Sequence, residues 1–392
     1  MECAICVFGE WYECFIEGIN MISFDFYCPT RIIFGKNKES RIGGEVAKYG
    51  KKILLHYGGG SIKKIGLYDK ITASLKEQGI EFVELGGVKP NPRLSLVQEG
   101  IELCRKEDID FILAVGGGSV IDSAKAIAVG VPYQGNVWDF YEGKAKIKEA
   151  LPLGVVLTIP AAGSESSPAS VITNEDGDLK RAIASELVIS KFSILNPETA
   201  MNLPEKQMAY GVTDILSHLM ERYFTNIDHV ELTDRLLEAT MKTVINNGLR
   251  LVDDYSDYDA WAEIMWSGTV AHNNLLNTGR IGCWGSHAIE HELSGIYDVA
   301  HGAGLAVIFP AWMQYVYKHD INRFAQFASR VWNVDMNYFS PEETALEGIA
   351  KMRQFFETLG LETKLQGIGI DDSRLEEMSQ KCAGEGTVGQ FV

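Results

Sequence analysis

Histidines gather in one short stretch of the C-terminal half of the sequence. Three of the eight histidines, His287, His291 and His301, fall within the nineteen residues SHAIEHELSGIYDVAHGAG. His287 and His291 stand four positions apart, so on a helix they share one face. We expect a turn near Gly295 between this pair and His301. Imidazole nitrogens bind divalent metal ions, and such a site would need further ligands from elsewhere in the chain.

A second pair of candidate ligands comes earlier in the sequence. Asp214 and His218 lie four apart in the helical pattern AYGVTDILSHLMERYF, again on one helix face. Either pair alone is also explained by helix caps and satisfied core histidines, but two pairs together favour a metal site. One carboxylate and three imidazoles suit Fe(II), Zn(II) or a similar divalent ion, and no thiolates lie nearby to form a structural zinc knot. The candidate ligands are Asp214, His218, His287 and His301. No role is assigned to His229, His272 and His319.

A glycine-rich turn in the N-terminal half has the features of a phosphate site. The stretch DFILAVGGGSVIDSAKAIAV reads as a buried strand, three glycines, and a helix that opens at Ser119 or Val120. Glycines let a backbone approach a phosphate closely, and a helix N-terminus offers free N–H groups and a positive dipole end. Asp122 follows in the first helical turn, where it can accept hydrogen bonds from a sugar or an amide. A tight turn without a ligand is the competing interpretation. The turn comprises Gly116, Gly117, Gly118 and Ser119.

The same pattern occurs once more, in KKILLHYGGGSIKK. In a usual dinucleotide site an acidic residue after a strand holds the adenosine ribose 2′-hydroxyl and repels a 2′-phosphate. That position holds Gly58 here, and Lys63 and Lys64 follow, so the pattern favours NADP(H) over NAD(H). No stretch matches GxGxxG or GxxxxGK[ST], so the turns are not an ordinary Rossmann or kinase fingerprint. The residues of this second turn are Gly58, Gly59, Gly60 and Ser61.

A third stretch adds polar groups at the end of another predicted strand. LTIPAAGSESS supplies the hydroxyls of Thr158 and Ser164. Lys180, in GDLKRAI, could reach a ribose or a phosphate, and a solvated surface lysine is the alternative interpretation.

The elements that must position these residues change character along the chain. Short apolar runs alternate with helical patterns up to about residue 200, which indicates a doubly wound, mainly parallel α/β sheet. Beyond that point the pattern is helical throughout. We therefore predict an N-terminal extension over residues 1–20, an α/β dinucleotide-binding domain over 21–200 and an all-helical metal-binding domain over 201–392.

The composition of the chain argues against several classes of binding partner. The 392 residues carry a formal net charge of −17, which argues against a nucleic-acid or anionic-membrane partner. No apolar run reaches the ~20 residues that span a bilayer. The seven cysteines form an odd, scattered set, which suits reduced thiols in the cytoplasm better than a disulfide framework.

Together these motifs resemble the iron-containing (group III) alcohol dehydrogenases, in particular their NADPH-dependent butanol dehydrogenase and aldehyde reductase branch. The resemblance runs from FDFYCPTRIIFGK to the C-terminus and includes GGGSVIDSAKAIA, TIPAAGSESS, LNPETAMNLPEKQMAYGVTD and HAIEHELSGIYDVAHGAGLA. It implies the dehydroquinate-synthase-like fold of this family and a metal bound by Asp214, His218, His287 and His301. It also implies that the turn at 116–119, with its Asp122, corresponds to the family's pyrophosphate-binding turn. By the same resemblance, Thr158 and Lys180 contact the cofactor, and His291 lies beside the nicotinamide.

The resemblance also implies a function. We expect a homodimer that interconverts primary alcohols and aldehydes of the butanol type by hydride transfer with NADP(H). Each chain would hold one divalent ion, with Fe(II) favoured and Zn(II) also compatible. His291 is a candidate proton relay or, alternatively, a core histidine behind the ligands. About twenty residues precede the family's usual start, and the chain stops at GTVGQFV, where relatives usually continue into a last helix. The alternatives are an NAD-dependent polyol dehydrogenase of the same fold, acting on glycerol-like substrates, and a non-catalytic nucleotide or metal sensor.

Overall fold

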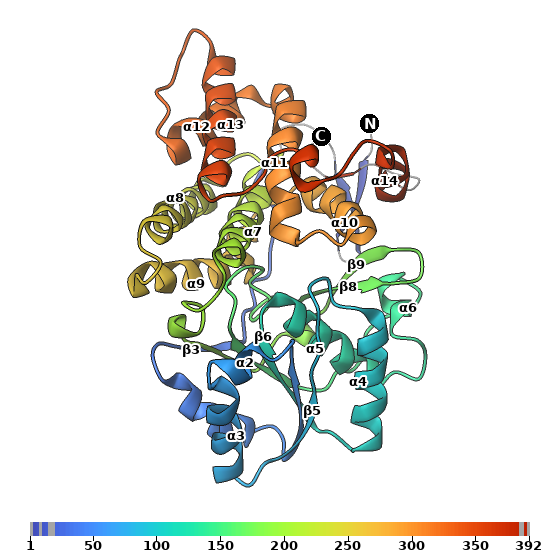
Figure 1. Cartoon of the computed structure of the whole chain (residues 1–392). Coiled ribbons are helices and arrows are strands. Elements are labelled where there is room, and N and C mark those ends of the chain that lie inside the picture. Colours follow the sequence, from blue (N-terminus) through green and yellow to red (C-terminus); the bar gives the residue numbers. More distant parts are fainter. Residues whose placement is uncertain (1–2, 8–9, 15–19, 384–387, 390–392) are drawn as a thin grey trace. The chain divides into compact units, whose positions relative to one another are not determined.

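The computed structural model describes residues 3–7, 10–14, 20–383 and 388–389 (Figure 1). The chain forms two compact units. Met1–Phe15 and Tyr27–Leu203 make up the first, and Ile16–Phe26 and Pro204–Val392 make up the second.

The first unit is built on a parallel sheet of six strands, in which every neighbouring pair is parallel. The inner strands are buried along almost their whole length, which explains why they read as continuous apolar runs such as FILAV rather than as alternating patterns. The predicted α/β fold class is confirmed. In spatial order the strands are β3 (Arg31–Phe34), β10 (Phe192–Leu195), β7 (Leu153–Leu157), β6 (Phe111–Gly116), β4 (Lys52–Tyr57) and β5 (Glu81–Leu85).

Helices cover both faces of this sheet, as a doubly wound fold requires. On one face, Ile62 of α2 and Ile71 of α3 join Leu55 of β4 in a single hydrophobic cluster. On the opposite face, the ring of His56 reaches from β4 to Ser123 of α5. The helices are α1 (Ile42–Val46), α2 (Ser61–Lys64), α3 (Leu67–Glu77), α4 (Leu94–Lys106) and α5 (Gly118–Gly130).

Two antiparallel strand pairs lie outside the main sheet. The pair β8 (Ala169–Asn174) and β9 (Leu179–Ala184) turns at Gly177 and Asp178, both of which have a positive φ. This hairpin, which we did not predict, carries Lys180. The second pair, β1 (Cys3–Val7) and β2 (Glu10–Cys14), falls in the segment interpreted from sequence as an extension. The short helix α6 (Trp138–Tyr141) contacts β9.

The second unit is helical in all the regular elements that the structure describes, which confirms the predicted class. Its central helix, α7, packs against α8, α9 and α11, while α10 packs against α11 and α14. Across the described part of the chain, no helix has the length and apolar character needed to cross a membrane. The helices are α7 (Glu205–Tyr223), α8 (Glu231–Asp253), α9 (Tyr258–His272), α10 (Gly285–Tyr297), α11 (His301–Val316), α12 (Ile321–Trp332), α13 (Pro341–Thr358) and α14 (Leu375–Ala383).

The turn expected near Gly295 is wrong. Helix α10 continues through this buried glycine to Tyr297, and the chain turns only at Asp298, which has a left-handed φ of 53°. A glycine inside a helix costs about 1 kcal/mol relative to alanine, and tertiary packing overrides that preference here.

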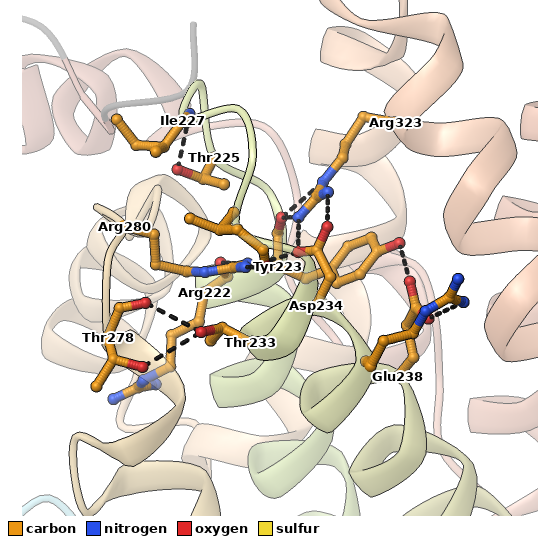
Figure 2. Close-up of polar contacts among 12 residues, drawn as sticks. Arg222, Tyr223, Thr225, Ile227, Thr233, Asp234, Glu238, Thr278, Arg280 and Arg323 are labelled. Carbon is orange, nitrogen blue, oxygen red and sulfur yellow. Dashed lines mark hydrogen bonds and ion pairs between the residues drawn. The ribbon is translucent and has the colours of Figure 1, made fainter. Parts of the chain in front are cut away.

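Two guanidinium groups, one buried and one partly buried, fix the C-terminal end of α7 (Figure 2). Arg280 donates to the carbonyl of Arg222 at 3.1 Å, and Arg323 donates to the carbonyl of Tyr223 at 2.9 Å. Asp234 on α8 accepts from both arginines at 2.6 Å. The last carbonyls of a helix have no partner within the helix, so these contacts satisfy them and hold the end of α7 in place.

Candidate metal centre and nucleotide-binding turns

Helices α7, α10 and α11 bring the four predicted metal ligands together within the second unit. One potential ligand atom from each of Asp214, His287 and His301 lies within 4.8 Å of the others. His218 Nδ1 lies 3.3 Å from Asp214 Oδ1, and the centre of its ring lies 4.8 Å from that of His287. Residues from three helices therefore converge on one point.

Two glycines of the HGAG stretch allow this close approach. A Cβ on Gly302 would lie 2.3 Å from the carbonyl oxygen of Tyr210 on α7. A Cβ on Gly304 would lie 2.8 Å from side-chain atoms of Glu290 on α10. The start of α11 can therefore pack against both neighbouring helices only with glycine at these positions.

Two glutamates that the sequence analysis missed stand behind the histidines. Glu221 Oε1 accepts a hydrogen bond from the backbone N–H of His287 at 3.0 Å and lies 2.8 Å from His287 Nδ1. Glu290 Oε2 is hydrogen-bonded to His301 Nδ1. A signal for Glu221 was present, because it lies seven residues after Asp214 and so shares its face of α7.

The arrangement fits a divalent cation. His287 Nε2 is buried and has no hydrogen-bond partner among the described residues. Asp214, Glu221 and Glu290 supply three buried carboxylates, whereas the guanidinium of Arg222 supplies one buried positive charge beside Glu221. With neutral histidines, these groups carry an excess of two negative charges. Buried charges are costly unless they are paired, so a divalent ion would complete the cluster.

His218 is suited to act as a neutral ligand. Burial lowers the pKa of His218 well below its ordinary value, and neighbouring positive or titratable groups, including Arg222, lower this pKa further. A neutral imidazole keeps the lone pair that a metal needs.

Further rings surround this point. The ring centre of His272, at the end of α9, lies 4.3 Å from that of His218, although sequence spacing gave His272 no role. Trp284 lies 5.4 Å from His287 between ring centres and precedes α10 with a left-handed φ of 61°. His291, partly exposed on α10, lies 5.8 Å from His301 by the same measure.

In the first unit, both glycine turns lie at the point where the strand order reverses. From β4 the chain adds β5 on one side and then crosses to β6 on the other. Tyr57 pairs with Val115 near the ends of β4 and β6, so the turns at 58–61 and 116–119 follow side by side. Open parallel sheets bind ligands at this switch point, outside the carboxyl ends of the strands.

The glycines of the turn at 116–119 are also required by packing. A Cβ on Gly116 would lie 2.4 Å from Val120, and one on Gly117 would lie 2.8 Å from Ile159. Helix α5 begins at Gly118, slightly before the predicted Ser119 or Val120. Packing therefore accounts for two of these glycines with or without a phosphate.

A buried lysine that the sequence analysis missed ties α5 to the loop after β7. Lys125 donates to the carbonyls of Ser164 and Ser167 at 2.7 and 2.8 Å. Asp122 in turn accepts from Ser164 Oγ at 2.6 Å and from the N–H of Val171 at 3.0 Å. Burial lowers the pKa of Lys125 to about 8 and raises the pKa of Asp122. Asp122 and Ser164, both predicted cofactor contacts, thus also hold this loop.

The other predicted cofactor contacts lie in the same unit. Thr158 is buried just after β7, and its N–H donates to the carbonyl of Gly116 at 3.0 Å. Lys180 on β9 is only 5% exposed, so the surface-lysine alternative is wrong. Its charge lowers the pKa of Asp122, partly offsetting the effect of burial.

The lysine that follows the turn at 58–61 has protein partners. Lys63 Nζ lies 3.3 Å from Glu84 Oε2 and stands over the rings of Tyr57 and Tyr68. Tyr57 also donates to Glu84 at 2.6 Å. This pairing weakens the argument that Lys63 is reserved for a 2′-phosphate.

A doubly wound sheet with glycine turns at its switch point, and a helical unit with a carboxylate and imidazole cluster, are the features expected of a metal-dependent dehydrogenase. Comparison with known proteins agrees with this class. Residues 29–197 match the family model described as iron-containing alcohol dehydrogenase, and residues 208–391 match that of the Fe-containing alcohol dehydrogenase family, C-terminal. The chain belongs to the iron-containing alcohol dehydrogenase family, which confirms the predicted resemblance.

Individual relatives are similar over almost the whole chain. The probable NADH-dependent butanol dehydrogenase 2 of Bacillus subtilis is 44% identical, with 95% of each chain covered. The NADPH-dependent aldehyde reductase YqhD of Escherichia coli is 36% identical, with 93% of this chain and 94% of the relative covered. The crystal structure of NADH-dependent butanol dehydrogenase A from Thermotoga maritima has a TM-score of 0.92 at 40% identity and covers 95% of this chain and 96% of its own. The names of these relatives divide between the two nicotinamide cofactors.

Proposed function

We propose that this protein interconverts primary alcohols and aldehydes of the butanol type, with NADP(H) as cofactor and one divalent metal ion per chain. The observation that carries the proposal is the convergence of Asp214, His218, His287 and His301 in a chain of the iron-containing alcohol dehydrogenase family. Fe(II) is favoured by the family, and Zn(II) accepts the same ligands. Relatives named as butanol dehydrogenases and as an aldehyde reductase support this substrate class.

Different residues of the chain bind the metal ion, bind the cofactor and transfer a proton. When bound, the ion supplies Lewis acidity toward the alcohol or aldehyde oxygen, and the nicotinamide supplies or accepts the hydride. The four ligands hold the ion, and the turns at 58–61 and 116–119 bind the cofactor phosphates through backbone N–H groups. Asp122, Thr158, Ser164 and Lys180 orient the rest of the cofactor. His291 passes a proton between the substrate oxygen and solvent.

The NADP(H) preference rests on Gly58, where NAD-using sites of this kind carry an acidic residue. The names of the two butanol dehydrogenase relatives favour NAD(H) as the second candidate. We also infer a homodimer in the cytoplasm, from the family resemblance and the scattered cysteines.

The test is reduction of butanal by the purified protein, with NADPH and NADH compared, alongside oxidation of glycerol with NAD. We expect butanal reduction in wild type, and loss of both bound metal and activity in His287→Ala. Loss of one ligand removes a bond to the ion and leaves Glu221 buried without its imidazole partner.

Three results would contradict the proposal. Full activity of His287→Ala would remove the metal assignment. Faster turnover of glycerol with NAD would favour the polyol dehydrogenase. Binding of NADPH and metal without turnover of any aldehyde would identify a sensor.

A further inference from the structure

We propose that Glu221 and Glu290 are positioning residues that fix the tautomer and ring orientation of His287 and His301, and thereby set the affinity of the centre for its ion. The inference rests on the proposed metal site. It concerns two residues to which the sequence analysis gave no role.

Glu221 holds His287 at two points. Its Oε1 accepts from the backbone N–H of His287 at 3.0 Å, and the same oxygen lies 2.8 Å from the ring Nδ1. Glu221 itself is 1% exposed. Nδ1 therefore carries the proton, and the lone pair belongs to Nε2, which is buried with no hydrogen-bond partner among the described residues. The free lone pair lies on the nitrogen that a metal would use.

Glu290, on the neighbouring helix α10, fixes the ring of His301 through a hydrogen bond to Nδ1. The carboxylate is fully buried, bonds His301 Nδ1 through Oε2, and accepts from Ser294 Oγ through Oε1. His301 Nε2 then lies on the inner side, 3.6 Å from Asp214 Oδ1. Close packing keeps Glu290 in place, because a Cβ on Gly304 would lie 2.8 Å from it.

The two glutamates also contribute charge. A carboxylate behind an imidazole makes the ring a stronger donor to a cation, and its own buried charge is balanced when that cation binds. Arg222 supplies only one positive charge beside Glu221. Replacing either glutamate by glutamine keeps the side chain's size and one acceptor oxygen, but it removes this charge and lets the amide present N–H donors to the ring instead.

Helix α10, which carries Glu290, also offers a matched control. Glu292 on α10 is 2% exposed, as buried as the other two, but it pairs with Lys381 at 3.8 Å. Glu292→Gln therefore reports the cost of removing a buried carboxylate from this region while Glu221 and Glu290 keep their bonds to His287 and His301.

The experiment measures metal binding directly. Full-length protein is stripped with a chelator and titrated with Co(II), whose visible absorption reports both affinity and ligand geometry. We expect Glu221→Gln and Glu290→Gln to bind Co(II) about 10- to 100-fold more weakly than wild type, with altered absorption. Glu292→Gln should bind as wild type does. Circular dichroism and melting of the metal-free proteins show whether each variant is folded.

If a glutamine variant does not fold, Glu221→Asp or Glu290→Asp replaces it, since aspartate keeps the charge but falls short of the ring. About a 10-fold loss is then expected. Wild-type Co(II) affinity in both folded glutamine variants would overturn the inference, even if wild type reduces butanal. Conversely, weakened Co(II) binding in a protein whose wild type reduces no aldehyde would overturn the proposed function and leave the inference standing.

Discussion

Gly58 is the single residue at which the cofactor preference of this chain is most directly tested. Its φ is not positive, and a Cβ would lie 3.5 Å from the carbonyl oxygen of Val88 and 3.9 Å from Val120, which are ordinary contacts. An aspartate therefore fits here. Its carboxylate would accept a hydrogen bond from a ribose 2′-hydroxyl and repel a 2′-phosphate.

We expect Gly58→Asp to lower the ratio of kcat/KM for NADPH over NADH by about tenfold or more, the size of one charged hydrogen bond. Gly58→Asn, which has the same shape without the charge, is the control. An unchanged ratio in Gly58→Asp would refute the 2′-phosphate interpretation. A wild-type preference for NADH would also refute it and would agree with Lys63 being occupied by Glu84.

Residue spacing indicated the candidate metal ligands, but it did not indicate the residues that surround and orient them. Asp214 and His218, and His287 and His291, show the four-residue repeat of a helix face, so sequence could group them. His272 joins the cluster only because the end of α9 meets α7 in space. Nor could the sequence say which of its many acids is buried, because that depends on packing between helices, as it does for Glu290.

At the scale of elements, His56 joins two strands and a helix. On β4, its Nδ1 contacts the carbonyl of Leu85 on β5 at 2.9 Å, and its Nε2 contacts Ser123 on α5 at 2.9 Å. The side chain is fully buried, and burial lowers the pKa of His56 to about 4. The folded state therefore holds this ring neutral over a pH range in which the unfolded chain protonates it.

Lowering the pH should reduce the unfolding free energy that buried, neutral His56 contributes. The stabilisation is complete above the unfolded pKa of about 6.5 and is lost as the pH falls toward 4. A difference of about 2.5 pKa units corresponds to roughly 3 kcal/mol of unfolding free energy. Urea unfolding of metal-free protein between pH 7 and pH 4 should show this loss. His56→Gln, which cannot titrate, should show a shallower pH dependence, and equal slopes would contradict the assignment.

Elements with a strong periodic pattern were predictable, and those set by tertiary contacts were not. The apolar runs of β4, β6 and β7 are continuous because both faces are covered, so they stand out in the sequence. The β8–β9 hairpin was missed because its strands are only partly apolar, and its turn depends on the left-handed residues Gly177 and Asp178. The end of α10 was misplaced because burial keeps Gly295 helical.

At the scale of the whole molecule, the net charge opposes binding of an anionic cofactor, whereas the local charge at its binding turns favours it. The chain carries −17 overall, so an anionic cofactor gains nothing from the general field of the protein. Backbone N–H groups at the glycine turns and the buried Lys180 must supply the attraction locally. A metal cation, by contrast, is favoured both by the net charge and by the buried carboxylates around Asp214.

Metal removal should therefore lower the stability of the whole protein. An ion that binds only the folded state adds about 3 kcal/mol to the free energy of unfolding when its free concentration is 100 times Kd. We expect a chelator to lower the melting temperature and added Zn(II) or Co(II) to restore it. The measurement is thermal unfolding by circular dichroism at fixed pH, with and without the ion.

Asp214→Asn separates this linkage from non-specific ion binding to an acidic surface. The variant removes one buried carboxylate of the centre and leaves nearly all of the surface charge in place. It should melt at a temperature that neither chelator nor added ion changes. If the variant and wild type gained the same stability from the ion, the ion would be acting on exposed carboxylates.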